Sequence, residues 1–454
     1  MIALMKFAKR FVIRKKEDIP IYAKGIWSPT AKDWVEIIED YIHISRSRIN
    51  NKMAMLKLQL TILEDIINYV TFNDQIKGEL KKLEEREHEV KPPDKIEEQI
   101  EFMKSDIFFH DLMIVALKEI IDGIVWRYFE FNRALLYILA DKEASGPVRP
   151  DKGLINTMYE LAQVFTNPGE AAILNDITNF LKVGNLTTIK SGGTIEFVEV
   201  KSGNRSGRGG RITRQKERMA EIVEFFNTGI GEYDGKKIRI VVSPVKQKNY
   251  LPLLLNIIRS AKARGYYSEI IGNYMIVECI YPERLDDSET AIEYFKNRHR
   301  SIKDQWEKMK DVVIPIFATE KLEFSKNFAP YTIFPFPDKI CADILCGRVT
   351  TRIITNYSEV MRIFHKNGWK TVDSIFFKNP DELEKIDITK TPMMIVGKGE
   401  AKIQIGPGMI GRIPFEFLSP KALIDEFERI YAGGSPEEAV LQLTSFSDEE
   451  TAWY

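Results

Sequence analysis

Two residues of opposite charge stand at the end of a predicted β-strand near the middle of the chain. The strand spans residues 194–201, and its apolar side chains are Ile195, Phe197, Val198 and Val200. Glu199 and Lys201 are two positions apart, so their side chains leave the same face of this strand. Mg²⁺ takes carboxylate and carbonyl oxygens, and a lysine beside it can orient or deprotonate water and steady the charge of a phosphate. This spacing therefore indicates phosphate chemistry at a divalent cation.

A second strand is predicted directly before this one, over residues 183–190. The residues between the two strands are Ser191-Gly192-Gly193, and a Gly-Gly pair allows the positive φ angles of a tight hairpin turn. The strands then run antiparallel, which brings Asn185, near the start of the first, opposite Glu199, near the end of the second. The spacing predicts one shared polar site at this end of the hairpin.

The segment after the hairpin carries the sharpest local excess of positive charge. Residues 201–218 hold seven cations and one acid, whereas the whole chain has a formal net charge of −1. The cations are Lys201, Arg205, Arg208, Arg211, Arg214, Lys216 and Arg218. The glycines of this segment predict a loop, and a helix is predicted from Arg211 to about Phe226. Such a cluster on a loop and a helix start favours binding of a sugar-phosphate backbone; the alternative is a solvated basic loop.

Together these residues resemble the PD-(D/E)xK nuclease superfamily, which has the restriction-endonuclease-like fold. That fold is a helix, a three-stranded meander, a second helix and a strand; a metal-binding Asp opens the second strand and Glu-x-Lys ends the third. The run Glu199-Val200-Lys201 matches the Glu-x-Lys element. Asn185, directly after Gly184 and fourteen positions before Glu199, stands where the family has its Asp. The resemblance covers roughly residues 168–245.

The resemblance implies a metal-dependent nuclease that hydrolyses phosphodiester bonds, with DNA favoured over RNA by the family's example. Mg²⁺ or Mn²⁺ would be held by Glu199, the Val200 carbonyl and residue 185, and Lys201 would activate or orient the attacking water. The phosphate contacts would come from Arg205, Arg208, Arg211, Arg214, Lys216 and Arg218. Gln215 matches a glutamine that nuclease members often carry on the following helix, although Met219 stands where some subfamilies have a tyrosine.

A further ligand is implied on the first helix, where resolvase-like members carry a Glu that enters the metal site. A helix is predicted to start at Asn167 and Pro168, and Glu170 is the residue that would take this role. The alternative for Glu170 is a carboxylate favoured at the helix N-terminus by the helix dipole.

Asn185 leaves three interpretations open, because an amide offers a cation only a neutral oxygen and so weakens the metal site. The chain is an active nuclease in which Glu170 or Asp176 helps to hold the metal, or a degenerate protein that only binds. The third interpretation is an Asp altered to Asn to trap substrate.

The functional hypotheses differ accordingly. A nuclease with accessory domains and no helicase or methylase motif suits restriction of foreign DNA, a defence role suggested by the family's habits. The second hypothesis is a non-catalytic nucleic-acid-binding or scaffold protein that retains the nuclease fold. The third is an assembly protein whose basic loop meets an acidic partner, with the N-terminal helices available for a homo-oligomer or a protein partner.

Composition sets the limits of these hypotheses. The 454 residues are 44% hydrophobic and 29% charged, which indicates a soluble protein of about three domains. The three cysteines form no CxxC pair and the five histidines are scattered, so we expect a reducing, cytoplasmic location and neither a disulfide framework nor a zinc site. No apolar run has the roughly 18 residues that span a bilayer, so no membrane partner is expected.

The predicted fold is an α/β multidomain protein with a helical N-terminal region, a restriction-endonuclease-like α/β core and a mixed α+β C-terminal region. The predicted domains are residues 1–150, 151–282 and 283–454, and the Pro- and Gly-containing segment 144–153 marks the first boundary. Before the site, helices are predicted over 28–89, 93–141 and 154–165, besides the one from Asn167. After it, strands are predicted over 237–243, 267–272, 274–281 and 352–355, a β-rich stretch over 392–417, and helices over 250–263, 286–310, 358–368 and 420–431.

Overall fold

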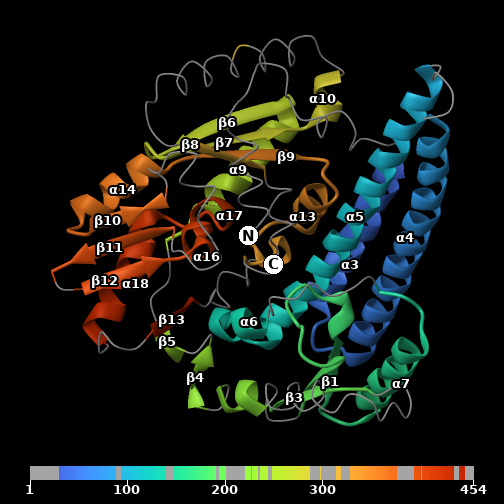
Figure 1. Ribbon diagram of the computed structural model, residues 1–454, viewed down its shortest axis with the longest axis horizontal. Coiled ribbons are helices and arrows are strands. Elements are labelled where there is room, and N and C mark those ends of the chain that lie inside the picture. The colour runs from blue at the N-terminus through green and yellow to red at the C-terminus, as the bar shows by residue number, and fades with distance from the viewer. Residues whose placement is uncertain are drawn as a thin grey trace.

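The computed structural model describes most of the chain as a mixture of helices and small sheets (Figure 1). The described residues are 30–87, 94–139, 148–190, 194–200, 220–225, 228–233, 236–243, 248–286, 297, 313–317, 328–375, 393–399, 401–433 and 439–444. Within these ranges the strands form one four-stranded and three three-stranded sheets. The general α/β character predicted from the sequence is therefore confirmed.

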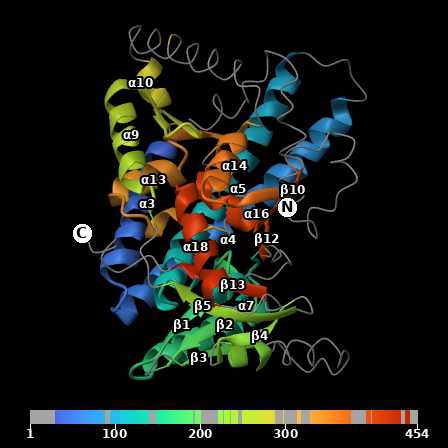
Figure 2. The ribbon, with the colours of Figure 1, turned by 90° about the vertical axis from the view of Figure 1, so that its left-hand side faces the viewer.

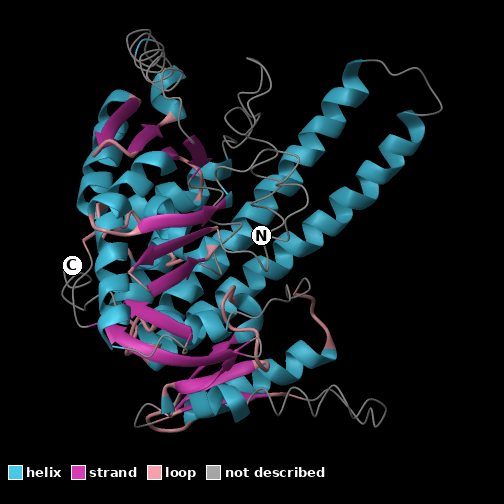
Figure 3. Ribbon diagram, turned by 60° about the vertical axis from the view of Figure 1, so that its left-hand side comes forward, coloured by secondary structure: helices cyan, strands magenta, loops and turns pink. Residues whose placement is uncertain are grey.

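The N-terminal region is helical, as predicted. It consists of α3 (Thr30–Ser47), α4 (Lys52–Glu87), α5 (Asp94–Tyr128) and α6 (Arg133–Leu139). α4 and α5 have 36 and 35 residues, lie against each other and project beyond the rest of the molecule (Figures 1 and 3). Apolar residues at helical spacing, such as Ile62 and Ile66 on α4 and Leu117 and Ile120 on α5, are buried and place these helices in the core.

A three-stranded meander follows α7 (Lys152–Thr166). Its strands are β1 (Ala171–Leu174), β2 (Leu186–Ile189) and β3 (Ile195–Val198), all antiparallel and in the order β1-β2-β3. Asp151 caps α7 by accepting the N–H of Leu154 at 2.8 Å. The meander is thus short, and β3 ends before Glu199.

The helix predicted from Asn167 is wrong. Residues 171–174 form strand β1, and Asn175–Ile177 form a single 3₁₀ turn, η1. The physical reason lies in contacts distant in sequence: Gln59 of α4 pairs with the free edge of β1, donating to the Ala172 carbonyl and accepting the Leu174 N–H, each at 2.9 Å. Both edges of β1 are then satisfied, one by β2 and one by a side chain. Asn167 ends α7 instead of starting a helix.

The remaining sheets join segments that are far apart in the chain. β4 (Ile230–Tyr233), β5 (Lys236–Ser243) and β13 (Ala439–Thr444) form one sheet, with β13 parallel to β5. β6 (Tyr266–Ile271), β7 (Met275–Ile280), β9 (Thr350–Asn356) and β8 (Val313–Phe317) form the second. The third consists of β10 (Lys370–Ser374), β11 (Met394–Lys398) and β12 (Ala401–Ile405). Figure 2 shows the sheet of β13, β5 and β4 at the same end of the molecule as the meander.

The helices of this part are α9 (Leu251–Arg264), α10 (Pro282–Asp286), α13 (Asp338–Leu345), α14 (Tyr357–Lys366), α16 (Pro407–Ile410), α17 (Arg412–Phe415) and α18 (Pro420–Gly433), with the 3₁₀ turn η3 (Tyr331–Ile333). The strands predicted after the site are confirmed as β5, β6, β7 and β9, and three of the helices as α9, α14 and α18. The stretch 392–417 is only partly β: its first half forms β11 and β12, but its second half forms α16 and α17. The helix predicted over 286–310 lies almost wholly outside the described residues.

Two sheets cross the predicted boundary between residues 282 and 283. β7 hydrogen-bonds to β9 along their whole lengths, and β5 hydrogen-bonds to β13. Buried apolar residues from the N-terminal helices, the meander and the C-terminal elements belong to one continuous core cluster. The region after the meander is therefore built from both sides of that boundary.

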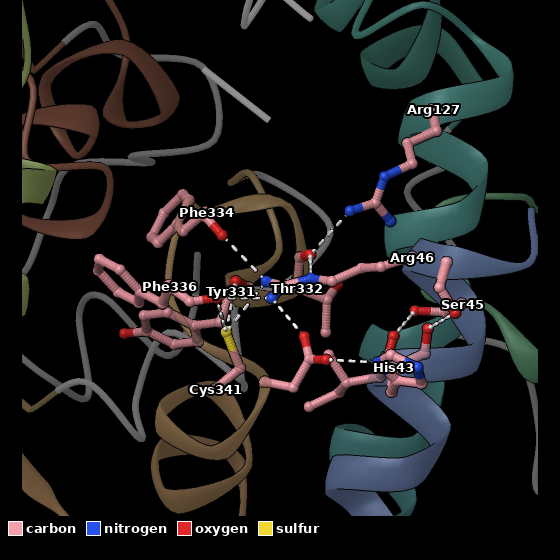
Figure 4. Close-up of polar contacts among 12 residues, drawn as sticks. His43, Ser45, Arg46, Arg127, Tyr331, Thr332, Phe334, Phe336 and Cys341 are labelled. Carbon is pink, nitrogen blue, oxygen red and sulfur yellow. Dashed lines mark hydrogen bonds and ion pairs between the residues drawn. The ribbon is translucent and has the colours of Figure 1, made fainter. Parts of the chain in front are cut away.

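Arg46 connects α3 to the segment around η3 and to the start of α13 (Figure 4). Its guanidinium donates to five acceptors. These are the carbonyls of Thr332, Phe334 and Phe336, the Asp338 carboxylate and Cys341 Sγ, at 3.0, 2.9, 2.6, 2.7 and 3.2 Å. Arg127 of α5 donates to the Thr332 carbonyl as well, at 3.2 Å. We refer to Arg46 with its five acceptors as the Arg46 cluster.

A buried ionic cluster ties α6 to α17 in the same way. Arg133 pairs with Glu416, which also accepts Arg412 Nε and the Ala329 N–H, each at 2.9 Å. Burial by itself raises the pKa of Glu416, but the two guanidinium groups outweigh it and lower the pKa to about 2. Glu416 therefore stays ionised inside the protein, and the N-terminal helices are fixed to the C-terminal region by charge as well as by apolar packing.

Candidate metal and nucleic-acid site at the end of the hairpin

The hairpin predicted from the Gly-Gly turn is confirmed by the register of β2 and β3. Leu186 pairs with Val198 and Ile189 pairs with Ile195. The paired register ends at Leu186 and Val198, and Asn185 and Glu199 are the residues next to this last pair, one on each strand's continuation. The turn residues 191–193 lie outside the described residues. The sequence prediction that Asn185 and Glu199 share one end of the hairpin therefore holds.

Asn185 contacts the peptide that follows Glu199. Its backbone N–H donates to the Val198 carbonyl at 2.8 Å, and its side-chain Oδ1 accepts the N–H of Val200 at 2.9 Å. The amide side chain thus continues the ladder where the regular strand pairing has ended. Residue 185 is held in direct contact with the segment that carries Glu199.

Gly184 allows this close approach. Its φ is +72°, in the left-handed region, and a Cβ on it would lie 2.9 Å from the Val198 carbonyl oxygen. Any side chain at this position would push the chain away from β3. The Gly-Asn pair therefore brings residue 185 against the end of β3.

The oxygens at this site suit a divalent cation in type but not in charge. Glu199 is exposed, and the Val200 carbonyl and Asn185 Oδ1 are neutral. Oδ1 already accepts a hydrogen bond, and the other terminal atom of Asn185 is an N–H₂ donor, which a cation repels. Among the described residues no group of three His, Cys, Asp or Glu side chains could hold a metal ion. The fit to Mg²⁺ or Mn²⁺ is therefore incomplete with Asn at position 185.

Glu170 does not join this site. Ala171 pairs with Ile189, so Glu170 lies beside Lys190 at the turn end of the meander. This is about five strand positions, or roughly 15 Å, from Asn185. Its carboxylate accepts Asn167 Nδ2 at 2.9 Å. The prediction of Glu170 as a metal ligand depended on a helix that the structure replaces with a strand.

Asp176, the other carboxylate considered for this role, lies on η1 at the same end of the sheet as Asn185. It is partly buried, and burial raises its pKa, while Lys118 of α5 and Lys182 lower it in part. Asp122 of α5, which acts on Lys118 as Asp176 does, is fully buried and accepts both the backbone N–H and Nδ2 of Asn179, at 2.8 and 2.7 Å. Burial raises the pKa of Asp122 to about 6. The charges that act on Asp176 thus come from α5, the β1–β2 connection and Asp151, which caps α7 and raises the pKa of Asp176 further.

One residue of the site has no signal in the sequence. Asn175 is 2% exposed, follows β1 and contacts the bend that presents Asn185. An Asn after a short apolar run is ordinary in loops, so its type and position do not distinguish it. Its partners are Thr187 on β2 and the residues just before that strand, and they become visible only when the meander is folded.

Several predicted site residues lie outside the described residues. These are Lys201, Arg205, Arg208, Arg211, Arg214, Gln215, Lys216 and Arg218. The described part of the helix predicted after the basic loop is residues 220–225, which are helical. The roles of the lysine, the glutamine and the basic cluster remain predictions.

Comparison with known proteins adds no relative. No family model matches the chain, and neither a curated protein nor a solved structure matches it. Among the described residues no helix is both long and apolar enough to cross a membrane.

Proposed function

We propose that the chain is a metal-dependent nuclease that hydrolyses phosphodiester bonds of nucleic acid, with DNA as the substrate favoured by family resemblance. One observation carries the proposal: the 2.9 Å hydrogen bond between Asn185 Oδ1 and the Val200 N–H, which fixes residue 185 beside the exposed Glu199. The order of elements supports it. Helix α7, the meander and a helix at 220–225 follow one another in the order that the superfamily has, whereas β4 and β5, which come next, pair with β13 in a separate sheet.

Each residue of the site has a role in this proposal. Glu199, the Val200 carbonyl and residue 185 would hold Mg²⁺ or Mn²⁺, which would supply Lewis-acid activation and neutralise charge on the phosphate. Lys201 would orient the attacking water or accept its proton. The basic residues from Arg205 to Arg218 would hold the phosphates on both sides of the cleaved bond. A role in restriction of foreign DNA, in the cytoplasm, fits this assignment.

A second candidate is favoured by a specific observation, the amide at position 185. With Oδ1 accepting the Val200 N–H, Nδ2 is a donor that can meet a phosphate oxygen directly, without a metal ion. The chain would then be a non-catalytic protein that binds nucleic acid on a nuclease fold. Its binding would weaken with salt, ignore divalent cations and be lost on substitution of Arg208, Arg211 and Arg214.

The variant Asn185→Asp separates the two candidates. A carboxylate oxygen accepts the Val200 N–H as well as the amide does, so the bend is preserved while the site gains a second negative ligand. We expect Mn²⁺ binding in calorimetry and cleavage of plasmid or single-stranded DNA to rise on the order of 100-fold over the chain with Asn185. Lys201→Ala in the Asn185→Asp background should abolish cleavage.

The matched control is Asn167→Asp, which makes the same change of charge at the opposite end of the meander. It should leave Mn²⁺ binding and cleavage at the level of the chain with Asn185. If Asn185→Asp neither binds Mn²⁺ nor cuts DNA, the nuclease proposal is wrong. Salt-sensitive DNA binding that is equal with and without Mn²⁺ then supports the second candidate.

A further inference from the structure

Asn175 makes four hydrogen bonds to the segment that presents Asn185. Its Nδ2 donates to the carbonyls of Val183 and Gly184, at 2.8 and 3.2 Å. Its Oδ1 accepts the Thr187 hydroxyl at 2.9 Å, and its backbone N–H donates to the Asn185 carbonyl at 3.0 Å. One buried side chain and its own peptide therefore bind positions 183, 184, 185 and 187 together.

These contacts hold the bend from the side of β1, whereas two hydrogen bonds to Val198 and Val200 hold Asn185 from the side of β3. Regular pairing of β2 begins at Leu186, so the carbonyls of Val183 and Gly184 lie before the strand and outside its ladder. Gly184 is in the left-handed region, where the chain changes direction toward β3. Buried carbonyls that lose their donors cost about 1–3 kcal/mol each, so the bend would relax without Asn175.

We propose that Asn175 is a positioning residue: it fixes the bend from Val183 to Asn185 so that residue 185 meets the Glu199–Val200 peptide. The register places Asn175, Asn185 and Glu199 at the same end of the meander, each next to the last paired residue of β1, β2 or β3. The chemical use of this clamp rests on the proposed function. The clamp itself can be tested without metal or substrate.

The first test uses the chain with Asn185 and the exchange of the Val200 amide hydrogen. That hydrogen is bonded to Asn185 Oδ1, so it reports the position of residue 185. Asn175→Ala should accelerate its deuterium exchange about tenfold, measured by mass spectrometry on peptides that contain Val200. Asn73→Ala is the matched control, because it removes an equally buried amide, bonded to Asp111 and His110, from the helical hairpin. It should leave Val200 exchange unchanged.

If Asn175→Ala does not fold, the variant Thr187→Val, which removes fewer contacts, can test the proposal instead. Thr187→Val removes only the hydroxyl that orients Asn175 Oδ1, with almost no change of shape. It should accelerate Val200 exchange in the same direction but less. Unchanged exchange at Val200 in whichever of these variants folds overturns the clamp.

The second test is Mn²⁺ affinity in the Asn185→Asp background. Residues that orient metal ligands typically change affinity 10- to 100-fold, so Asn175→Ala should weaken Mn²⁺ binding by roughly that factor. Asn73→Ala in the same background should not change it. If Asn185→Asp alone fails to bind Mn²⁺, the proposed function fails, whereas the Val200 exchange still decides the clamp. If Asn185→Asp binds Mn²⁺ and Asn175→Ala leaves the affinity unchanged, the positioning role is wrong.

Discussion

The Arg46 cluster and the hairpin end each fix an irregular backbone segment through one polar side chain, but they differ in what that side chain leaves exposed. In each, one polar side chain binds several backbone groups and fixes an irregular segment: Arg46 holds residues 332–336, and Asn175 holds residues 183–185. The Arg46 guanidinium donates to carbonyls (Figure 4) and to Asp338, and the Arg46 side chain is only 10% exposed. The hairpin end, by contrast, leads to the exposed carboxylate of Glu199.

This difference separates a structural cluster from a candidate site. Dense hydrogen bonding by itself shows only that buried polar groups are satisfied, which any stable core requires. A candidate for chemistry also needs a reactive group that the clamp holds toward solvent. Glu199 is an exposed carboxylate next to the peptide that Asn185 binds, whereas the acceptors around Arg46 are backbone carbonyls, a buried thiol and a carboxylate already paired with Arg46.

The largest effect is expected on breaking the Arg46 cluster. Arg46→Ala removes five hydrogen bonds at once and leaves three carbonyls and a carboxylate without this donor. We expect a loss of about 3–5 kcal/mol in the free energy of unfolding, measured by urea denaturation, because one partner of a buried network is removed. DNA binding by the folded fraction should be unchanged.

The matched control for Arg46 is Arg149→Ala. Arg149 pairs with Asp74 on the surface, where the two side chains are 62% and 53% exposed. Its loss should cost less than about 1 kcal/mol. Equal costs for the two arginines would show that the Arg46 contacts do not stabilise the fold.

A smaller effect is expected at the hairpin end itself, on Gly184→Ala. The new Cβ meets the Val198 carbonyl oxygen at 2.9 Å and the residue keeps a φ of +72°. We expect a loss of about 2 kcal/mol in unfolding free energy, from backbone strain and from displacement of β3. Urea denaturation measures the loss.

The control for this substitution is Gly399→Ala. Gly399 has a φ of +61° but no heavy atom within 4 Å of an added Cβ, so only the backbone strain remains. It should cost about 1 kcal/mol. If both glycines cost the same, the contact with Val198 is not what confines residue 185.

The two regions also differ in how far the sequence reveals them. The hairpin was predictable because a Gly-Gly turn, apolar residues and paired charges lie within about twenty positions of one another. The Arg46 cluster could not be predicted, because the acceptors of Arg46 lie 286 to 295 positions away in the sequence. An arginine on a helix gives no sign of what it binds. Periodicity found the long helices for the same reason that it found the hairpin: both are local patterns.

The wrong prediction of a helix at residues 167–182 arose because local sequence signals favoured a helix while distant contacts favour a strand. Asn167-Pro168-Gly169-Glu170 is typical of a helix start, and the following apolar residues fit either a helix or a buried strand. Gln59 and β2 decide in favour of a strand by satisfying both edges of β1, and neither is a near neighbour in sequence. This wrong prediction is also why Glu170 was assigned to the metal site: the assignment required a helix, whereas the structure places Glu170 at the turn end of the meander.

The smallest effect on Mn²⁺ affinity and DNA cleavage is expected for Glu170→Gln. This variant tests directly whether Glu170 lies outside the metal site. If Glu170 were a ligand, this neutral isostere would remove a charge from the metal and weaken Mn²⁺ binding of the Asn185→Asp variant by more than tenfold. The register instead places Glu170 at the turn end of the meander, far from Asn185, so we expect Mn²⁺ affinity and DNA cleavage within about twofold of the parent. Glu199→Gln in the same background is the matched comparison, since it makes the identical change at the end of β3. A large effect at Glu170 together with a small one at Glu199 would mean that the metal is bound at the opposite end of the sheet.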